Sequence, residues 1–155
     1  MAATTIYMTI EASSGPIPGE STSKTKPNAI RCTYYSYGAN VELGTSASGG
    51  ASVGKPHRMP VIIHKAISNS SPRLMKALLT GEALKTVTIE LINGTKTFFT
   101  VTLERVTITS IQHSVPDADE TPDAIEEIEF VFNKITFKSA NGSTVIDDTV
   151  ANKTT

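Results

Sequence analysis

The sequence is poor in the residues that usually mark a disulfide, metal or catalytic site. Its 155 residues include one cysteine, three histidines and no tryptophan. A single thiol, Cys32, excludes an internal disulfide. The histidines show no His-x-x-x-His spacing and no cysteine pair accompanies them, whereas a typical zinc site needs such a pattern. The sequence therefore predicts neither a disulfide scaffold nor a metal site.

Three further absences concern charge, long hydrophobic runs and a signal peptide. The 14 basic and 15 acidic side chains give a net charge of −1, which provides no general attraction to nucleic acid or to anionic lipid. No apolar run approaches the about 18 residues of a membrane-spanning helix. Residues 1–7 lack the basic and apolar regions of a secretory signal peptide. We therefore expect a soluble protein, made in the cytoplasm, that binds neither nucleic acid nor membranes.

Sequence signatures of enzymes are also missing. The chain contains no P-loop, no dinucleotide-binding glycine pattern and no nucleophile elbow. His64 stands in an apolar stretch typical of a strand, so we expect it on a sheet face rather than acting as a base. Cys32 is expected to pack within a strand. We predict no catalytic, cofactor-binding or metal-ligating residues, and hence no enzyme.

The chain is rich in β-branched residues. It contains 22 threonines, 15 isoleucines and 10 valines, about 30% of the chain, against seven leucines. Branching at Cβ restricts χ1 and favours strands over helices. With 39% apolar and 19% charged residues, the composition excludes a disordered chain and a coiled coil. These values predict a single, mainly β domain spanning residues 1–155.

One helix is predicted among the strands, over residues 72–80. Ser71 suits the N-cap, Pro72 the first helical position and Gly81 the residue after the C-terminus. The apolar residues of this segment are expected to form one stripe that docks on a sheet; they are Leu74, Met75, Leu78 and Leu79. Strands are expected on either side of the helix, over residues 4–11, 29–37 and 59–66 before it.

The segment after residue 81 reads as strands and turns. Asn93-Gly94 and Asn141-Gly142 predict hairpins. The phase of the apolar residues changes by one at Glu104-Arg105 and again at Asn133-Lys134, which indicates a bulge or tight turn at each place. Such slips in long strands predict strongly coiled strands. The expected fold is a small antiparallel β-barrel of two packed sheets with one short flanking α-helix.

Three polar segments interrupt this pattern. Residues 44–54 contain four glycines and three serines, so we expect a flexible loop over about residues 40–55. A C-terminal tail is expected over about residues 149–155. Residues 117–129 hold seven carboxylates in thirteen positions and lack the central glycine of an EF-hand loop. We interpret them as a solvated loop leading into a strand with Glu127 and Glu129 on its outer face; the alternative is a contact with a basic partner.

The order of several short motifs resembles a known family. The motifs are Pro18-Gly19-Glu20-Ser21, Gly54-Lys55-Pro56-His57, the strand 61–67, Ser70-Ser71-Pro72-Arg73-Leu74, Thr80-Gly81-Glu82 and the glutamate-rich strand region 126–137. In this order they are similar to the haemolysin-coregulated protein (Hcp) family, the inner-tube subunit of bacterial type VI secretion systems, over about residues 4–148. Ser68-Asn69 replaces an Asp-containing pair common in the family before Ser-Ser-Pro.

This resemblance implies a tube-forming protein. Hexameric rings of such subunits stack into a tube that a contractile sheath ejects together with the tip spike, and small effectors can bind in the ring lumen. The implied partners are therefore further copies of the chain, sheath and spike-tip proteins, and effector cargo, and secretion needs no signal peptide. The implied subunit and ring contacts lie in the loop over about residues 40–55, at Gly44, Ser46, Ser48, Gly49, Gly50, Val53, Gly54 and Lys55. The alternative is a monomeric β-barrel or sandwich that binds a small ligand or glycan.

Overall fold

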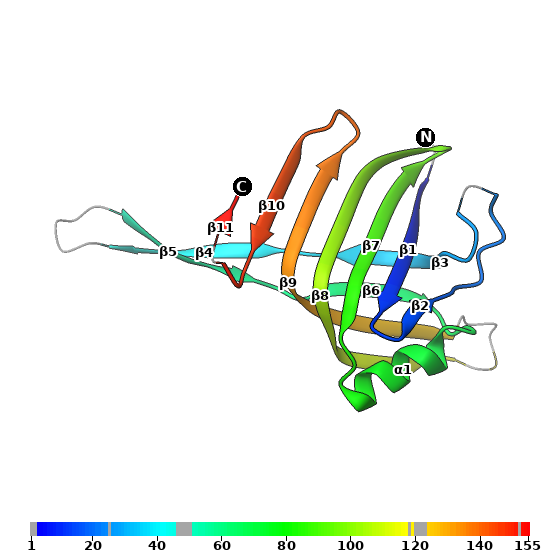
Figure 1. Cartoon of the computed structure of the whole chain (residues 1–155). Helices are drawn as coiled ribbons and strands as arrows, with labels where there is room; N and C mark the ends of the chain where they lie inside the picture. The colour runs from blue at the N-terminus through cyan, green and yellow to red at the C-terminus, as the bar shows by residue number, and fades with distance from the viewer. Residues whose placement is uncertain (1–2, 25, 46–50, 118, 120–123, 152) are drawn as a thin grey trace.

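A computed structural model describes residues 3–24, 26–45, 51–117, 119, 124–151 and 153–155. In these residues it contains one helix and a series of antiparallel strands (Figure 1). Their bounds are β1 Thr4–Ala12, β2 Gly15–Ile17, β3 Ile30–Ser36, β4 Ala39–Thr45, β5 Ala51–Arg58, β6 Val61–Ala66, α1 Ser71–Thr80, β7 Leu84–Asn93, β8 Lys96–Ser114, β9 Ile125–Ser139, β10 Thr144–Asp148 and β11 Lys153–Thr154.

Six of the strands close into a barrel. Strand order runs β9-β6-β3-β1-β7-β8, and β8 pairs again with β9, so the sheet has no free edge within this circle. β10 and β11 extend the wall beyond β9, and β2 pairs with β1. The predicted small antiparallel barrel with one flanking helix is confirmed.

The barrel interior is filled by side chains. Alternate residues along each strand point inward, and their apolar side chains form one buried cluster; it includes Met8, Ile10, Ile30, Ile63, Val87, Ile89, Val101, Leu103, Val106, Ile128, Phe130 and Ile135. Most of these residues are β-branched, as the composition predicts. Because the cluster occupies the space between the walls, the barrel has a packed core rather than a channel.

Both predicted phase slips lie side by side in the wall. β8 pairs with β9 through Glu104↔Lys134 and Val106↔Phe132. Arg105 and Asn133 therefore lie opposite each other between these two residue pairs. Arg105 has a φ of 53°, in the left-handed region that few residues other than glycine adopt. Figure 1 shows β8 and β9 bending together along their length. The slips thus form one corner at which both strands turn around the core.

The helix is placed as predicted, with two differences. Gly81 ends it with a φ of 69°, but the N-cap residue is Ser70 and not Ser71. The hydroxyl of Ser71 is instead engaged in a buried polar network described below. Leu74 is buried, whereas Leu79 is 77% exposed. The expected stripe is therefore wrong at Leu79, because that position lies about 100° around the helix from Leu78 and turns away from the barrel.

The expected loop at residues 40–55 is wrong at residues 40–45 and 51–55, which form strands, and residues 46–50 lie outside the described residues. β4 and β5 pair antiparallel from Ala39↔Arg58 to Thr45↔Ala51, and they form a hairpin separate from the barrel sheet. Backbone hydrogen bonds hold these strands and need no apolar side chains, so composition alone does not reveal them. Figure 1 shows this hairpin projecting away from the barrel. We call β4 and β5 the arm.

The expected C-terminal tail likewise contains a short strand. β11 returns to pair with β10 through Asp147↔Thr154 and Asp148↔Lys153. The last residues therefore add to the edge of the wall beyond β9.

Candidate functional site

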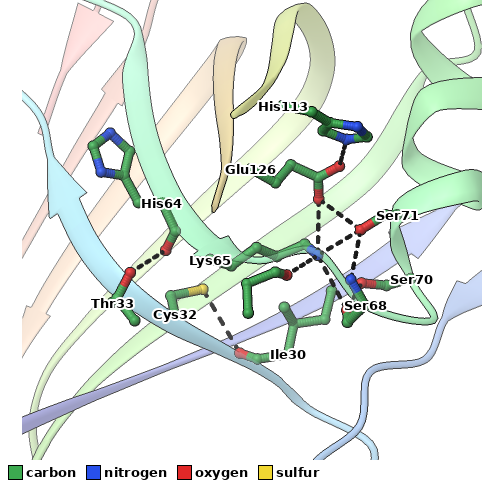
Figure 2. Close-up of polar contacts among 11 residues, drawn as sticks. Ile30, Cys32, Thr33, His64, Lys65, Ser68, Ser70, Ser71, His113 and Glu126 are labelled. Atoms are coloured by element: carbon green, nitrogen blue, oxygen red, sulfur yellow. Dashed lines mark hydrogen bonds and ion pairs between the residues drawn. The ribbon is translucent and has the colours of Figure 1, made fainter. Parts of the chain in front are cut away.

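A lysine and a glutamate are fully buried in the barrel wall under α1. Lys65 on β6 lies opposite Glu126 on β9, and both side chains have 0% exposure. The Lys65 Nζ atom lies 2.8 Å from Glu126 Oε1. It also donates hydrogen bonds to the Ala66 carbonyl at 3.0 Å and to the hydroxyls of Ser68 and Ser71, each at 3.2 Å. Figure 2 shows these side chains converging on the ammonium group.

The glutamate is held from three sides. Besides Lys65, the Ser71 hydroxyl donates to Glu126 Oε1 at 3.2 Å, and His113 Nε2 lies 2.6 Å from Glu126 Oε2 (Figure 2). The Ser71 hydroxyl also accepts the backbone N–H of Ser68 at 2.9 Å. A buried charge is strongly destabilising unless it is paired and hydrogen-bonded, and here both charges are. The network therefore fastens α1, β6, β8 and β9 together.

This network does not have the properties of a nucleophile pair. A serine beside a lysine can act in acyl transfer when the lysine is neutral and serves as the base. Here the Lys65 ammonium is held by the Glu126 carboxylate, and Ser71 is 3% exposed. A substrate would reach neither group. The arrangement is suited to holding the helix on the barrel.

The sequence analysis missed this network, although a signal was present. Lys65 shares its strand face with the buried Val61 and Ile63, and Glu126 shares its face with Ile128. Two opposite charges in phase with the core residues of two strands indicate a buried ion pair. Glu127 and Glu129 lie on the outer face of β9 as predicted, whereas Glu126, which the sequence analysis assigned to neither face, is buried.

The two other candidate residues behave as the sequence predicts. Cys32 is 2% exposed, and burial raises the pKa of its thiol to about 12. Such a thiol is unreactive at neutral pH. His64 lies on the outer face, where its ring stacks on Tyr34 at 4.4 Å and its Nε2 lies 3.0 Å from Glu127 Oε2. Among the described residues no group of three or more His, Cys, Asp or Glu side chains is placed to hold a metal ion.

The arm is the second feature of the site. Two apolar side chains of β4 are exposed, by 44% at Val41 and 72% at Leu43. At its base Arg58 pairs with Asp147 of β10, with Nη2 donating to Oδ1 at 2.9 Å. The hydrogen bond from Arg58 lowers the pKa of Asp147. The arm is thus anchored to the barrel at its base, and Val41 and Leu43 expose apolar surface further along it.

The predicted contact residues fall on or around this arm. Gly44 belongs to β4, and Gly54 and Lys55 belong to β5; all three are exposed. Val53 pairs with Leu43 across the arm. The remaining contact residues lie outside the described residues; they are Ser46, Ser48, Gly49 and Gly50.

These features define a class: a closed, core-filled antiparallel barrel with one helix pinned to its wall and a projecting hairpin arm. Residues 7–138 match the family model described as "Type VI secretion system effector, Hcp". The match covers most of the chain, and the protein belongs to this family. No curated protein sequence matches the chain. No helix in the described part of the chain has the length and apolar character needed to cross a membrane.

Solved structures support the same fold. A structure described as that of a type six secretion system protein superposes with a TM-score of 0.85 at 20% identity, covering 99% of this chain and 100% of that one. A crystal structure of an Hcp protein gives a TM-score of 0.82 at 24% identity, covering 94% and 98%. Hcp1 from Salmonella typhimurium gives 0.79 at 19% identity and covers both chains completely.

Proposed function

We propose that this protein is a structural subunit of the type VI secretion inner tube and not an enzyme. Copies form hexameric rings, and the rings stack into a tube that a contractile sheath ejects with the spike-tip proteins. The whole chain acts as one tube domain. The chain belongs to the Hcp family. The observation that carries this proposal is its arm, which projects from a closed barrel and has exposed apolar side chains.

The arm has physical reasons to need a neighbour. An isolated two-stranded hairpin is at best marginally stable in water. Burying an exposed leucine or valine on another subunit contributes about 1.5–3 kcal/mol for each side chain. Leu43 and Val41 offer such a gain without any change in the barrel. The predicted subunit and ring contacts at Gly44, Gly54 and Lys55 are part of this proposal.

The filled barrel argues against the alternative function. A monomeric barrel that binds a small ligand needs an open interior or a concave site between its walls. Here the core side chains occupy the interior. A ligand of the assembled protein would instead lie in the lumen between subunits, where we place small effector cargo. Synthesis in the cytoplasm and export by the secretion machine are part of this proposal.

The proposal is tested by the mass and shape of the purified protein. At tens of micromolar we expect particles of about six chain masses by light scattering and annular particles by negative-stain microscopy. Leu43→Asp should impair assembly, because it places a charge in the apolar contact, while circular dichroism stays unchanged. Val150→Asp is a matched control, since Val150 is also well exposed, at 65%, but lies outside the arm. A strictly monomeric wild type would overturn the proposal.

A further inference from the structure

A charged concavity lies at the corner where β8 and β9 bend. It has a volume of about 400 Å³, and its lining includes the cations Lys85, Arg105 and Lys134 and the anions Glu104 and Asp148. It does not belong to the arm or to the buried network. It lies at Arg105, the one non-glycine residue of the described barrel strands that has a left-handed backbone conformation. This bend gives the concavity a defined geometry.

The pairing of the strands explains how the charges come together. One row of paired residues crosses four strands; it consists of Thr86, Glu104, Lys134 and Asp148. The next row pairs Leu84 with Val106. Lys85 and Arg105 are the residues left between the two rows, on neighbouring strands, and both are exposed. The bend therefore brings two cations together at one surface point.

The anions of this concavity are already engaged, whereas two of its cations are not. Asp148 Oδ1 accepts the backbone N–H groups of Val150 at 3.1 Å and Ala151 at 2.9 Å. Glu104 Oε2 lies 3.5 Å from Lys134 Nζ. Lys85 and Arg105 have no hydrogen-bond or ion-pair partner within the described part of the chain. A lysine and an arginine side by side are suited to bind carboxylates, because the guanidinium group can donate two parallel hydrogen bonds.

Matching carboxylates occur at the other end of the same strands. Asp117 and Asp119 follow the end of β8, and both are exposed. The second half of β8, from Val106 to Ser114, spans about 26 Å at the rise of a strand. In Figure 1 this end of β8 lies beyond α1, away from β10. The concavity and these aspartates of one copy therefore cannot meet, but those of two copies can.

We propose that Lys85 and Arg105 of one copy bind Asp117 and Asp119 of the next copy, which makes a directional, head-to-tail contact around the ring. This inference rests on the proposed ring assembly. A contact between two different patches of the same chain is heterologous, and it closes into a ring when the rotation per subunit permits. The two patches lie at different points along β8, so a contact between them joins different surfaces of two copies. The contact also gives the acidic segment a basic partner.

The test uses two charge-reversed variants. The first, Lys85→Glu with Arg105→Glu, places negative charge against the aspartates of its own neighbours. The second, Asp117→Lys with Asp119→Lys, places positive charge against Lys85 and Arg105. Each alone should raise the concentration for half-assembly about tenfold or more, because like charges then face each other at every interface. Light scattering and negative-stain microscopy measure the assembly.

Mixing the two variants in equal amounts gives the sharpest result. In an alternating ring with an even number of subunits, every interface then joins opposite charges, so rings should return. A matched control reverses two other exposed lysines of the same strands, Lys96→Glu with Lys138→Glu, which changes the net charge equally. This control should assemble alone and should not restore rings when mixed with the aspartate variant. Unchanged circular dichroism shows that all variants fold.

Three outcomes would overturn the proposal: rings formed normally by the Lys85/Arg105 variant, no rings in the mixture, or equal loss in the control. In each of these cases the wild type still forms rings, so the proposed tube function stands. A wild type that forms no rings contradicts the proposed function itself. The two failures are therefore distinguishable.

Discussion

The barrel wall beneath α1 and the arm differ in which side chains they bury: the wall buries charged groups, and the arm exposes apolar ones. In the wall, two charges are fully buried, yet each has its partners inside the same chain. In the arm, apolar side chains such as Leu43 are exposed and lack cover. The wall has its partners within one copy, whereas in the proposed ring a neighbouring copy covers the arm. Changes in the wall should therefore affect folding, and changes in the arm should affect association.

The largest effect is expected from breaking the buried ion pair. Glu126→Gln leaves the Lys65 ammonium buried without its counter-charge, which should lower the free energy of unfolding by about 3–5 kcal/mol. Urea denaturation followed by circular dichroism measures this loss. A matched double variant, Lys65→Met with Glu126→Leu, removes both charges and should recover most of the stability. An unchanged unfolding midpoint for Glu126→Gln would show that the ion pair does not stabilise the folded barrel.

A smaller effect is expected from a glycine substitution in the segment that lies against the start of β3, with a matched one in the arm. A Cβ at Gly19 would lie 2.5 Å from the Ala29 carbonyl oxygen, so the backbone must shift. A Cβ at Gly54 would lie 3.3 Å from the Glu42 carbonyl oxygen, a much milder contact. We expect Gly19→Ala to cost about 1–3 kcal/mol of unfolding free energy and Gly54→Ala less than about 1 kcal/mol. Equal losses in thermal denaturation would contradict the distinction between the two regions.

A still smaller effect on folding is expected from shortening the arm. Deletion of residues 46–52 should change the free energy of unfolding by less than about 1 kcal/mol, because the barrel strands keep all their partners. Stacking of the rings into tubes should nevertheless be impaired. Chemical denaturation and electron microscopy of the same sample measure both properties. Loss of the folded barrel would show that the arm is part of the folding unit.

The smallest effect concerns acid stability near the end of α1. Arg73, and secondly Ser14, hydrogen-bond Glu82 and hold the pKa of its carboxyl at about 2, below the 4.5 of the free group. A lowered pKa in the folded state adds stability that is present above about pH 4.5 and is lost as the pH falls toward 2. Glu82→Gln should therefore flatten the decline in melting temperature between these values. A decline as steep as that of the wild type would contradict this assignment.

The sequence predicted those parts of the fold that follow from alternation and turn chemistry. The strands of the barrel, the helix end at Gly81 and the corner at Arg105 are confirmed, because each depends on residues close in sequence. The buried pair was missed because Lys65 and Glu126 are far apart in the chain, and each alone reads as a surface residue. The arm was missed because its pairing depends on backbone groups that composition does not describe.

The acidic segment, residues 117–129, also shows that composition does not reveal which charged residues are buried. Glu126 faces the core and binds Lys65, whereas Asp117 stays exposed before the strand begins. Composition gives both the same character, and the start of β9 at Ile125 separates them. A charged residue can therefore be assigned to the core or to a partner only once the strand and its register are known.

The role of the arm in assembly is tested most directly by comparing the particle mass of the wild type with that of Leu43→Asp by light scattering. We expect a wild-type particle of about six times the 16.5 kDa chain mass, and a folded Leu43→Asp variant with weakened assembly. A monomeric wild type, or a Leu43→Asp variant that assembles as well as the wild type, would contradict the claim that the barrel folds without a neighbour whereas the arm packs on a neighbour in a ring.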